Sequence, residues 1–406
     1  MKVAIVVETF ARDMGYINNT FPKYLARAGV DVHVVTTDLS PYHQLGSAVQ
    51  VFGRAFAERN LNEPDSCERL DGYTLHTLPH RNVFGYPRAV GLAAKLAAIS
   101  PDIVCIFQAA GWIPLDCARL QRRLGYRLIV GSHMGKTVFR MPGGMFSPRR
   151  VRSFLLRTLP GWFIASRADG CVVPTIDCAE VVADHFGIPA NIVSVMNLPV
   201  DTDFFYPDDG PLRPALAAPS NRMEIRTSLG ISESDFLCVY SGKFTIDKNA
   251  IVLAQAADIL RSQGHAVTAL FIGAGPQEEL IRASSSAIVL PFMPVSRLGD
   301  YYRAADAGVW MNESISFLDG ASCGLPLILS DEVKDISHLQ EFTSIFRAGD
   351  AQSLADQIKL VMEPALHFER RTLAAELAHR RFSGPRYAQM RMDQFSALLP
   401  GEQRAA

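Results

Sequence analysis

Short apolar runs alternate with segments of helical periodicity along nearly the whole chain. Apolar runs of strand length, bounded by turn residues and separated by helical segments, are typical of parallel strands that helices cover on both faces. The expected strands are Val3–Val7, Val32–Thr36, Ile103–Phe107, Arg127–Gly131, Gly170–Pro174, Ile192–Met196, Phe236–Ser241, Ala266–Ile272, Ala287–Leu290, Ala307–Met311 and Pro326–Ser330. The pattern predicts an α/β protein with two doubly wound sheets in tandem.

Length and composition fit two domains. The chain has 406 residues, of which 48% are hydrophobic and 20% charged, and this is enough apolar material for two cores. The segment 208–221 is rich in proline and small residues and predicts an exposed connector. We expect an N-terminal domain over 1–205, a second domain over 206–370, and a helical tail over 371–406 that crosses back to the first domain.

Charge and cysteine usage narrow the class of protein. A net charge of −1 and a pI near 6.8 give no electrostatic reason to expect nucleic acid as a partner. The seven scattered cysteines include no CxxC pair and are typical of reduced thiols. The first apolar run ends at Glu8 and is too short for the hydrophobic region of a signal peptide. No apolar run in the sequence is long enough to span a bilayer. We therefore expect a soluble cytoplasmic protein.

The loop that opens the second domain has the composition of a phosphate-binding loop. Within Tyr240–Asn249 a strand ends at Gly242, and Lys243 and Lys248 follow before a helix begins. Two cations beside the free N–H groups of a helix N-terminus suit a diphosphate. A solvated loop with two surface lysines is the alternative interpretation.

Two further segments of the second domain follow strands and carry small residues. In Ile272–Pro276, Gly273 and Gly275 form half of a dinucleotide fingerprint, a weak signal by itself, and let a ligand approach the backbone. In Ala305–Asp331 a strand, a helix start with Asp319 and a second strand follow one another. Open α/β sheets bind ligands at such positions, although an ordinary crossover packed through small residues has the same pattern.

These segments, taken in order, carry a family resemblance. The matching motifs are Val200–Phe205, Gly242–Asn249, Ile272–Pro276, Tyr301–Asp306, Asp319–Pro326 and Ala348–Ile358. Together they resemble the family 4 retaining nucleotide-sugar glycosyltransferases, glycosyl transferases group 1. The resemblance covers essentially the whole chain and implies the GT-B architecture, in which two Rossmann-like domains face a central cleft.

The resemblance implies roles for the acidic motif of the second domain. Asp319 takes the position of the acid that holds the nucleotide ribose, and a carboxylate that accepts from two hydroxyls is suited to that role. The family's first motif acid, which would contact the donor sugar, is replaced here by Met311. Glu313 is a doubtful substitute for it, and Ser314 and Ser316 are further candidates for the sugar pocket. The identity of the donor sugar stays open.

By the same resemblance Lys243 and Lys248 would neutralise the donor diphosphate, with Gly242, Gly273 and Gly275 beside them. Lysine supplies a point charge where the family usually has the fork of an arginine at the first position. Each well-placed donor to a developing phosphate charge is worth roughly 3 kcal/mol of barrier. The resemblance also implies retention of anomeric configuration, with no cofactor and no metal.

The first domain is expected to shape the acceptor side. Gly15 lies in a loop after the first strand that resembles the family's glycine loop at the cleft, and no GxGxxG follows that strand, which argues against a nicotinamide dehydrogenase. His133 resembles the histidine that the family places near the donor sugar, in a binding role. A histidine at a strand end is otherwise more often structural.

Two other features have more than one interpretation. Asp201–Asp203 is a DxD triplet of the kind that holds a divalent metal in another glycosyltransferase fold, but its place at the domain junction favours a turn and helix-cap element. The segment Lys136–Arg167 interleaves arginines with aromatic and aliphatic residues. It is either a peripheral contact with an anionic membrane or a core-packed helix with a solvated basic edge.

The leading hypothesis is a glycosyltransferase that uses a nucleotide-sugar donor and a carbohydrate, glycolipid or small-metabolite acceptor. A nucleotide-sugar epimerase of the same architecture is one alternative, and it would turn over the donor without an acceptor. A non-catalytic sugar- or nucleotide-binding protein is the other, because Met311 stands where the family has its first acid.

Overall fold

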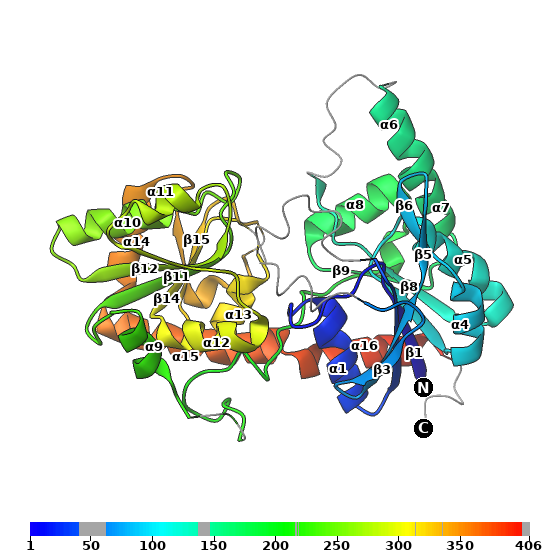
Figure 1. The fold of residues 1–406 in the computed structure, drawn as a ribbon, viewed down its shortest axis with the longest axis horizontal. Helices are drawn as coiled ribbons and strands as arrows, with labels where there is room; N and C mark the ends of the chain where they lie inside the picture. The colour runs from blue at the N-terminus through cyan, green and yellow to red at the C-terminus, as the bar shows by residue number, and fades with distance from the viewer. Residues whose placement is uncertain are drawn as a thin grey trace.

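The computed structural model describes residues 1–39, 62–136, 147–215, 217, 219–312, 314–334 and 336–399. Over these residues the chain forms two α/β domains that lie side by side, each built on a sheet with helices on both faces (Figure 1). The predicted pair of doubly wound sheets is confirmed.

The first sheet has the strand order β10-β9-β8-β7-β1-β2-β4-β3. Its strands are β1 (Lys2–Val6), β2 (Asp31–Thr37), β3 (Cys67–Leu70), β4 (Tyr73–Leu78), β7 (Ile103–Ile106), β8 (Arg127–Gly131), β9 (Gly170–Val173) and β10 (Val193–Val195). All pair in parallel except β3, which is antiparallel to β4. The order of successive strands reverses between β1 and β7, and their carboxyl ends therefore flank a topological switch point.

Helices cover both faces of the first sheet because its central strands are apolar on both sides. Val3 and Ile5 of β1 pack into one core cluster, and Ala4 and Val6 pack into the other. The covering helices are α1 (Ile17–Arg27), α4 (Leu92–Ile99), α5 (Trp112–Leu124), α7 (Leu159–Ala165) and α8 (Ile176–Phe186). The short helix α6 (Pro148–Ser153) projects away from the sheet (Figure 1). A π-helical turn, Phe154–Thr158, joins α6 to α7.

The second sheet is parallel throughout, with the order β13-β12-β11-β14-β15-β16 and its switch point between β11 and β14. Its strands are β11 (Phe236–Lys243), β12 (Val267–Ala274), β13 (Ala287–Leu290), β14 (Ala307–Trp310), β15 (Leu327–Ser330) and β16 (Thr343–Phe346). The helices are α9 (Arg222–Ser228), α10 (Ile251–Ser262), α11 (Glu278–Arg282), α12 (Val295–Ala304), α13 (Ser316–Ser322), α14 (Ala351–Val361) and α15 (Pro364–Phe382).

The chain crosses between the domains at two segments that lie against each other. Val200 N–H donates to the Phe382 carbonyl, and Gly384 N–H donates to the Val200 carbonyl, each at 2.8 Å. Beyond this point α16 (Gly384–Leu398) runs beneath the first domain (Figure 1). There Tyr387 and Phe395 join the core cluster that also contains β1. The last helix therefore completes the hydrophobic core of the first domain.

Five strands were not predicted: β3, β4, β16 and a separate hairpin of β5 (His80–Val83) and β6 (Tyr86–Ala89). The hairpin was missed because its strands are mostly polar and only one of their residues is buried. Its turn consists of Phe84 and Gly85, both with positive φ, as a tight two-residue hairpin requires. None of the described helices is both long and apolar enough to cross a membrane.

Candidate active site

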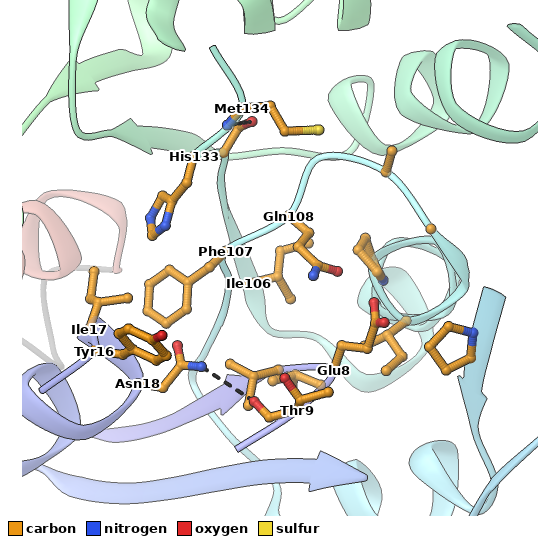
Figure 2. A pocket seen from close by; sticks show the side chains of 18 of the residues that line it. Glu8, Thr9, Tyr16, Ile17, Asn18, Ile106, Phe107, Gln108, His133 and Met134 are labelled. Atoms are coloured by element: carbon orange, nitrogen blue, oxygen red, sulfur yellow. Dashed lines mark hydrogen bonds between the residues drawn. The ribbon is translucent and has the colours of Figure 1, made fainter. Parts of the chain in front are cut away.

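Two cavities open at the switch points of the two sheets. The smaller, of about 240 Å³, is lined by the ends of β11 and β12, by residues 314–316 and Asp319, and by residues 14–16 of the first domain; we call it the C-domain pocket. The larger, of about 540 Å³, is lined by the ends of β1 and β7 and the starts of α1 and α5; we call it the N-domain pocket (Figure 2). Both occupy the place where doubly wound sheets bind ligands.

The two pockets adjoin, because Tyr16 and Ile315 line both of them. The loop that carries Tyr16 is fixed to the other domain by a hydrogen bond from Val295 N–H to the Asp13 carbonyl, 3.1 Å long. Gly15 has φ +65°, and a Cβ there would lie 3.0 Å from Cγ2 of Val295. This glycine therefore allows the first domain to close against α12 at the mouth of the C-domain pocket.

Asp319 is half-buried in the first turn of α13 and lines the C-domain pocket. No described residue donates a hydrogen bond to its carboxylate or forms an ion pair with it. Burial, and to a lesser degree the nearby charge of Asp201, raises the pKa of this carboxyl well above its ordinary value. An unpartnered carboxyl facing a cavity is suited to accept hydrogen bonds from the hydroxyl groups of a ligand.

The floor beneath Asp319 is a hydrogen-bonded cluster around Tyr302. The hydroxyl of Tyr302 lies 2.5 Å from Oγ of Ser241 and also bonds Ser316. Trp310 packs edge-on against Tyr302 at 6.2 Å and donates its Nε1–H to the Ser241 carbonyl at 3.2 Å. These contacts fix the position of the end of β11 relative to the start of α13.

The two predicted cationic residues have different surroundings. Lys243 ends β11 with an exposed side chain that lines the C-domain pocket. Lys248 does not line that pocket in the described structure; its Nζ donates to Oδ1 of Asn312 at 2.7 Å. Asn312 in turn donates to the Asp247 carbonyl at 2.9 Å. Asn312 therefore fixes the lysine loop, a role that could have been suspected from its position just after β14.

Two of the predicted glycines, Gly273 and Gly275, have no room for a side chain because backbone atoms pack closely against them. A Cβ at Gly273 would lie 1.9 Å from the Gly242 carbonyl oxygen, and one at Gly275 would lie 2.7 Å from the Phe244 backbone. Gly242 and Gly273 line the C-domain pocket, but Gly275 does not. We expected these glycines to let a ligand approach the backbone. For Gly273 and Gly275, packing between neighbouring backbone segments is the more direct explanation.

His133 lies in the other cavity. Its ring faces the N-domain pocket, 6.0 Å from the ring of Phe107 and tilted 31° to it (Figure 2). Its side chain is exposed to the cavity, but the surrounding protein reduces its hydration and lowers its pKa, and the imidazole is therefore neutral at pH 7. The structure thus gathers Gly15, Gly242, Lys243, Gly273, Ser314, Ser316 and Asp319 around one pocket and places His133 in its neighbour.

The other two positions considered for the family's acidic motif are Met311 and Glu313. Met311 has 5% of its surface exposed, and its carbonyl accepts from Ser330 Oγ, 2.5 Å away. It belongs to the core and does not line the pocket. Glu313 lies outside the described residues.

The DxD triplet forms a turn that binds α1. The carbonyl of Asp201 accepts from the N–H groups of Phe204 and Phe205, and its side chain accepts from Lys23. Burial disfavours the ionised form of Asp203, but hydrogen bonds from Arg27 and Lys23 outweigh this effect and lower its pKa to about 2. Both carboxylates are thus engaged by cations of the first domain, and the expected turn is present.

Comparisons with known proteins agree with this geometry. The Glycosyltransferase Family 4 model matches residues 20–204, and the Glycosyl transferases group 1 model matches residues 235–363. D-inositol 3-phosphate glycosyltransferase from Geodermatophilus obscurus is 28% identical over 186 residues, which are 41% of this chain and 38% of that relative. The aligned part therefore spans well under half of either protein.

Solved structures resemble the chain over nearly its full length. Sucrose-phosphate synthase from Thermosynechococcus elongatus superposes with a TM-score of 0.67 at 16% identity, covering 98% of this chain and 100% of that one. Anabaena HepE in complex with UDP and glucose gives 0.66 at 13% identity, with the same coverage. At these identities the likeness shows the fold. With a family model on each domain, the chain belongs to the family 4, group 1 glycosyltransferases of GT-B architecture.

Proposed function

We propose that this glycosyltransferase moves a sugar from a nucleoside-diphosphate sugar to a hydroxyl acceptor, with retention of anomeric configuration and without a metal. The observation that carries the proposal is Asp319, whose carboxyl faces the C-domain pocket without a partner among the described residues. A ribose with two adjacent hydroxyls would supply the two donors that this group can accept. The structures of HepE with UDP and with UDP-glucose support a nucleotide-sugar donor.

The lysine loop would stabilise the departing diphosphate. As the bond from the anomeric carbon to the β-phosphate oxygen breaks, negative charge grows on the phosphates. Lys243 lines the pocket already, and Lys248 lies five residues along, held by Asn312. Two ammonium groups can neutralise this charge in place of a divalent cation, which is why we propose a metal-independent reaction.

The acceptor would enter through the N-domain pocket and meet the donor at Tyr16 and Ile315, where the pockets adjoin. Its hydroxyl oxygen would bond to the anomeric carbon on the face that the leaving group vacates, and its proton would pass to a phosphate oxygen. His133, neutral at pH 7, would bind substrate and leave this proton transfer to the phosphate.

We also propose a peripheral contact with an anionic membrane through residues 136–167. In Figure 1 α6 stands away from the body of the first domain. Between Lys136 and Asp169 the sequence contains six arginines and no acid. The large apolar side chains exposed along α6, the π-turn and α7 are Val151, Phe154, Leu155, Leu159 and Trp162. A surface with this combination of charge and apolar area suits the headgroup region of an anionic bilayer.

Thermal stabilisation by a panel of nucleoside diphosphates and nucleotide sugars, with and without EDTA, tests the donor site. We expect one nucleotide to raise the Tm of the wild type, with or without EDTA. The control variant is Asp356→Ala, on the exposed face of α14, and it should respond in the same way. Asp319→Ala should lose this response. Absence of any nucleotide response would overturn the proposal, and a chelator-sensitive response would overturn its metal-independent part. Proton NMR of the product's anomeric coupling then reports retention or inversion.

Sedimentation with vesicles tests the membrane contact. Leu155→Glu, on the exposed π-turn, should weaken binding to vesicles containing anionic phospholipid. Leu360→Glu, an exposed leucine on α14 of the other domain, should not. Equal binding to neutral and anionic vesicles, or equal binding of the two variants, would contradict this part of the proposal.

A further inference from the structure

The N-domain pocket combines aromatic side chains with uncharged polar groups. Tyr86 and Trp112 supply aromatic surface, and Asn18, Gln108 and Thr9 supply amide and hydroxyl groups. Pockets with this composition bind compact ligands that have both apolar and hydroxylated surface. Tyr86 comes from the hairpin β5–β6, which therefore forms part of the pocket wall.

Trp112, the first residue of α5, is held in one orientation. Its Nε1–H donates to the Val83 carbonyl of the hairpin at 2.9 Å. The guanidinium of Arg88 lies 5.4 Å from the indole centroid and is itself fixed by bonds of 2.6 and 2.8 Å to Asp116. Phe84, in the turn of the hairpin, stacks on the indole with the ring centroids 6.5 Å apart. The part of the indole that lines the pocket has its polar edge satisfied and its position locked, and is therefore a preorganised apolar contact for a ligand.

Polar groups extend into the same space from the ends of β1 and β7. Figure 2 shows the side chains of Gln108 and Glu8 directed toward the interior of the pocket, with Asn18 beside Thr9. Asn18 donates to the Thr9 carbonyl at 3.4 Å, which leaves its amide oxygen available. No described residue bonds the exposed amide of Gln108. Amides that both donate and accept are well matched to hydroxyl groups.

The charges of the described lining do not favour a phosphate. Among the described lining residues, Glu8 and Arg157 are the two with a permanent charge, and the Nε–H of Arg157 is directed to the Tyr86 hydroxyl at 3.2 Å. His133 is neutral at pH 7. Phosphate sites combine several converging cations with backbone N–H groups. The starts of α1 and α5 bring N–H groups to this pocket, but among its described lining residues only Arg157 brings a permanent positive charge.

We infer that the acceptor presents an uncharged sugar ring to this pocket, packed against Trp112, with its hydroxyls bound by Gln108 and Glu8. The C–H bonds on one side of a pyranose give it an apolar surface, and its hydroxyls need both donors and acceptors. This inference rests on the proposed function, because it names the chemical class of the acceptor at the pocket that adjoins the donor site.

Saturation-transfer NMR tests the inference with methyl glycosides of glucose, galactose and N-acetylglucosamine as probes, with glucitol and glucose 6-phosphate for comparison. At least one ring glycoside should receive saturation on its ring protons in the presence of a nucleoside diphosphate. Trp112→Ala and Gln108→Ala should each reduce the signal at least five-fold, and Trp112→Phe should restore part of it. Phe368→Ala removes an exposed aromatic side chain from α15 and should change nothing.

The outcomes separate the two proposals. The saturation signal of the nucleotide itself reports binding at the C-domain pocket. If the wild type gave no such signal, that result would count against the proposed function. With that signal intact, three results would overturn the acceptor inference: no glycoside signal, tighter binding of glucose 6-phosphate, or a glycoside signal that Ser316→Ala abolishes and Trp112→Ala leaves unchanged. The last result would place the sugar in the donor pocket.

Discussion

The Nζ atom of Lys23 lies 2.8 Å from both carboxylate oxygens of Asp201, although 178 residues separate the two in the sequence. Lys23 is on α1, and Asp201 is on the segment where the chain leaves the first domain. Both are almost fully buried, and the Tyr24 hydroxyl adds a third bond to Asp201 at 2.9 Å. The pair fixes the crossing segment to the first domain.

Removing one partner of this buried pair should be strongly destabilising. Lys23→Met leaves the Asp201 carboxylate buried without its cation, and we expect a loss of about 3–5 kcal/mol in the free energy of unfolding. Arg27→Ala removes the neighbouring pair with Asp203, which is largely exposed, and should cost about 1 kcal/mol or less. Urea unfolding of the wild type, Lys23→Met and Arg27→Ala measures both losses in the free energy of unfolding. Similar losses for the two variants would contradict the structural importance of the Lys23–Asp201 pair.

A methyl group at Gly273 should not fit. It would lie 1.9 Å from the Gly242 carbonyl oxygen, where two strands of the second sheet meet at the pocket. The added methyl group should therefore strain the backbone or push β11 away from β12. We expect Gly273→Ala to lower the free energy of unfolding by about 3 kcal/mol or more and to weaken nucleotide binding. The free energy of unfolding and the nucleotide-induced rise in Tm report the two effects.

Gly264→Ala is the matched control for this variant. Gly264 also has a positive φ, of 88°, but a Cβ there would meet nothing within 4 Å. It should cost only the backbone strain, on the order of 1 kcal/mol, and leave nucleotide binding unchanged. If the two variants behaved alike, the effect at Gly273 would come from its backbone conformation and not from the contact with Gly242.

Sequence patterns were sufficient for most strands because buried parallel strands are apolar on both faces. They failed where that signal is weak. The strands β5 and β6 are mostly polar and only partly buried, and their residues predict a loop. The strands β4 and β16 are mostly buried, but threonine, histidine or serine interrupts their apolar runs. The acid at Asp319 was visible from its position between a strand and Gly324-Leu325-Pro326. The role of Asn312 and the locked orientation of Trp112 depend on contacts between distant segments, which no local pattern contains.

Asn312 should act on turnover through Lys248. We expect Asn312→Leu to release the Lys248 ammonium group from its 2.7 Å bond and to lower kcat about 10-fold, with a smaller effect on the KM of the donor. Lys248→Ala should lower kcat further, and the double variant should be no worse than Lys248→Ala alone. Additive losses in this cycle would show that Asn312 acts independently of the lysine.

Lys243→Arg tests the other cation separately. Its side chain is exposed at the pocket, and a guanidinium can contact two phosphate oxygens where an ammonium contacts one. The variant should keep most of the activity, whereas Lys243→Ala should lose about 100-fold in kcat/KM. Steady-state kinetics with the donor identified by thermal stabilisation measures both. An active Lys243→Ala variant would remove this residue from the proposed diphosphate site.

Asp319→Asn should separate stability from binding. Burial raises the pKa of Asp319, and the folded protein therefore binds this proton more tightly than the unfolded chain does. The stability contributed by the protonated carboxyl is present below the ordinary aspartate pKa, near 4, and is lost as the pH rises toward the folded-state value. Asparagine has no such ionisation. In the absence of nucleotide the variant should thus gain stability relative to the wild type as the pH rises, measured as a growing difference in Tm.

Nucleotide binding should respond in the opposite direction. The ionised carboxylate accepts from two ribose hydroxyls, and the wild type should therefore bind more tightly as the pH rises through the pKa of Asp319, whereas Asp319→Asn should bind weakly at every pH. Thermal unfolding and nucleotide titration from pH 5 to pH 9 measure both trends. A destabilised Asn variant with unchanged nucleotide affinity would mean that the carboxylate stabilises the fold of the second domain and does not bind the ribose.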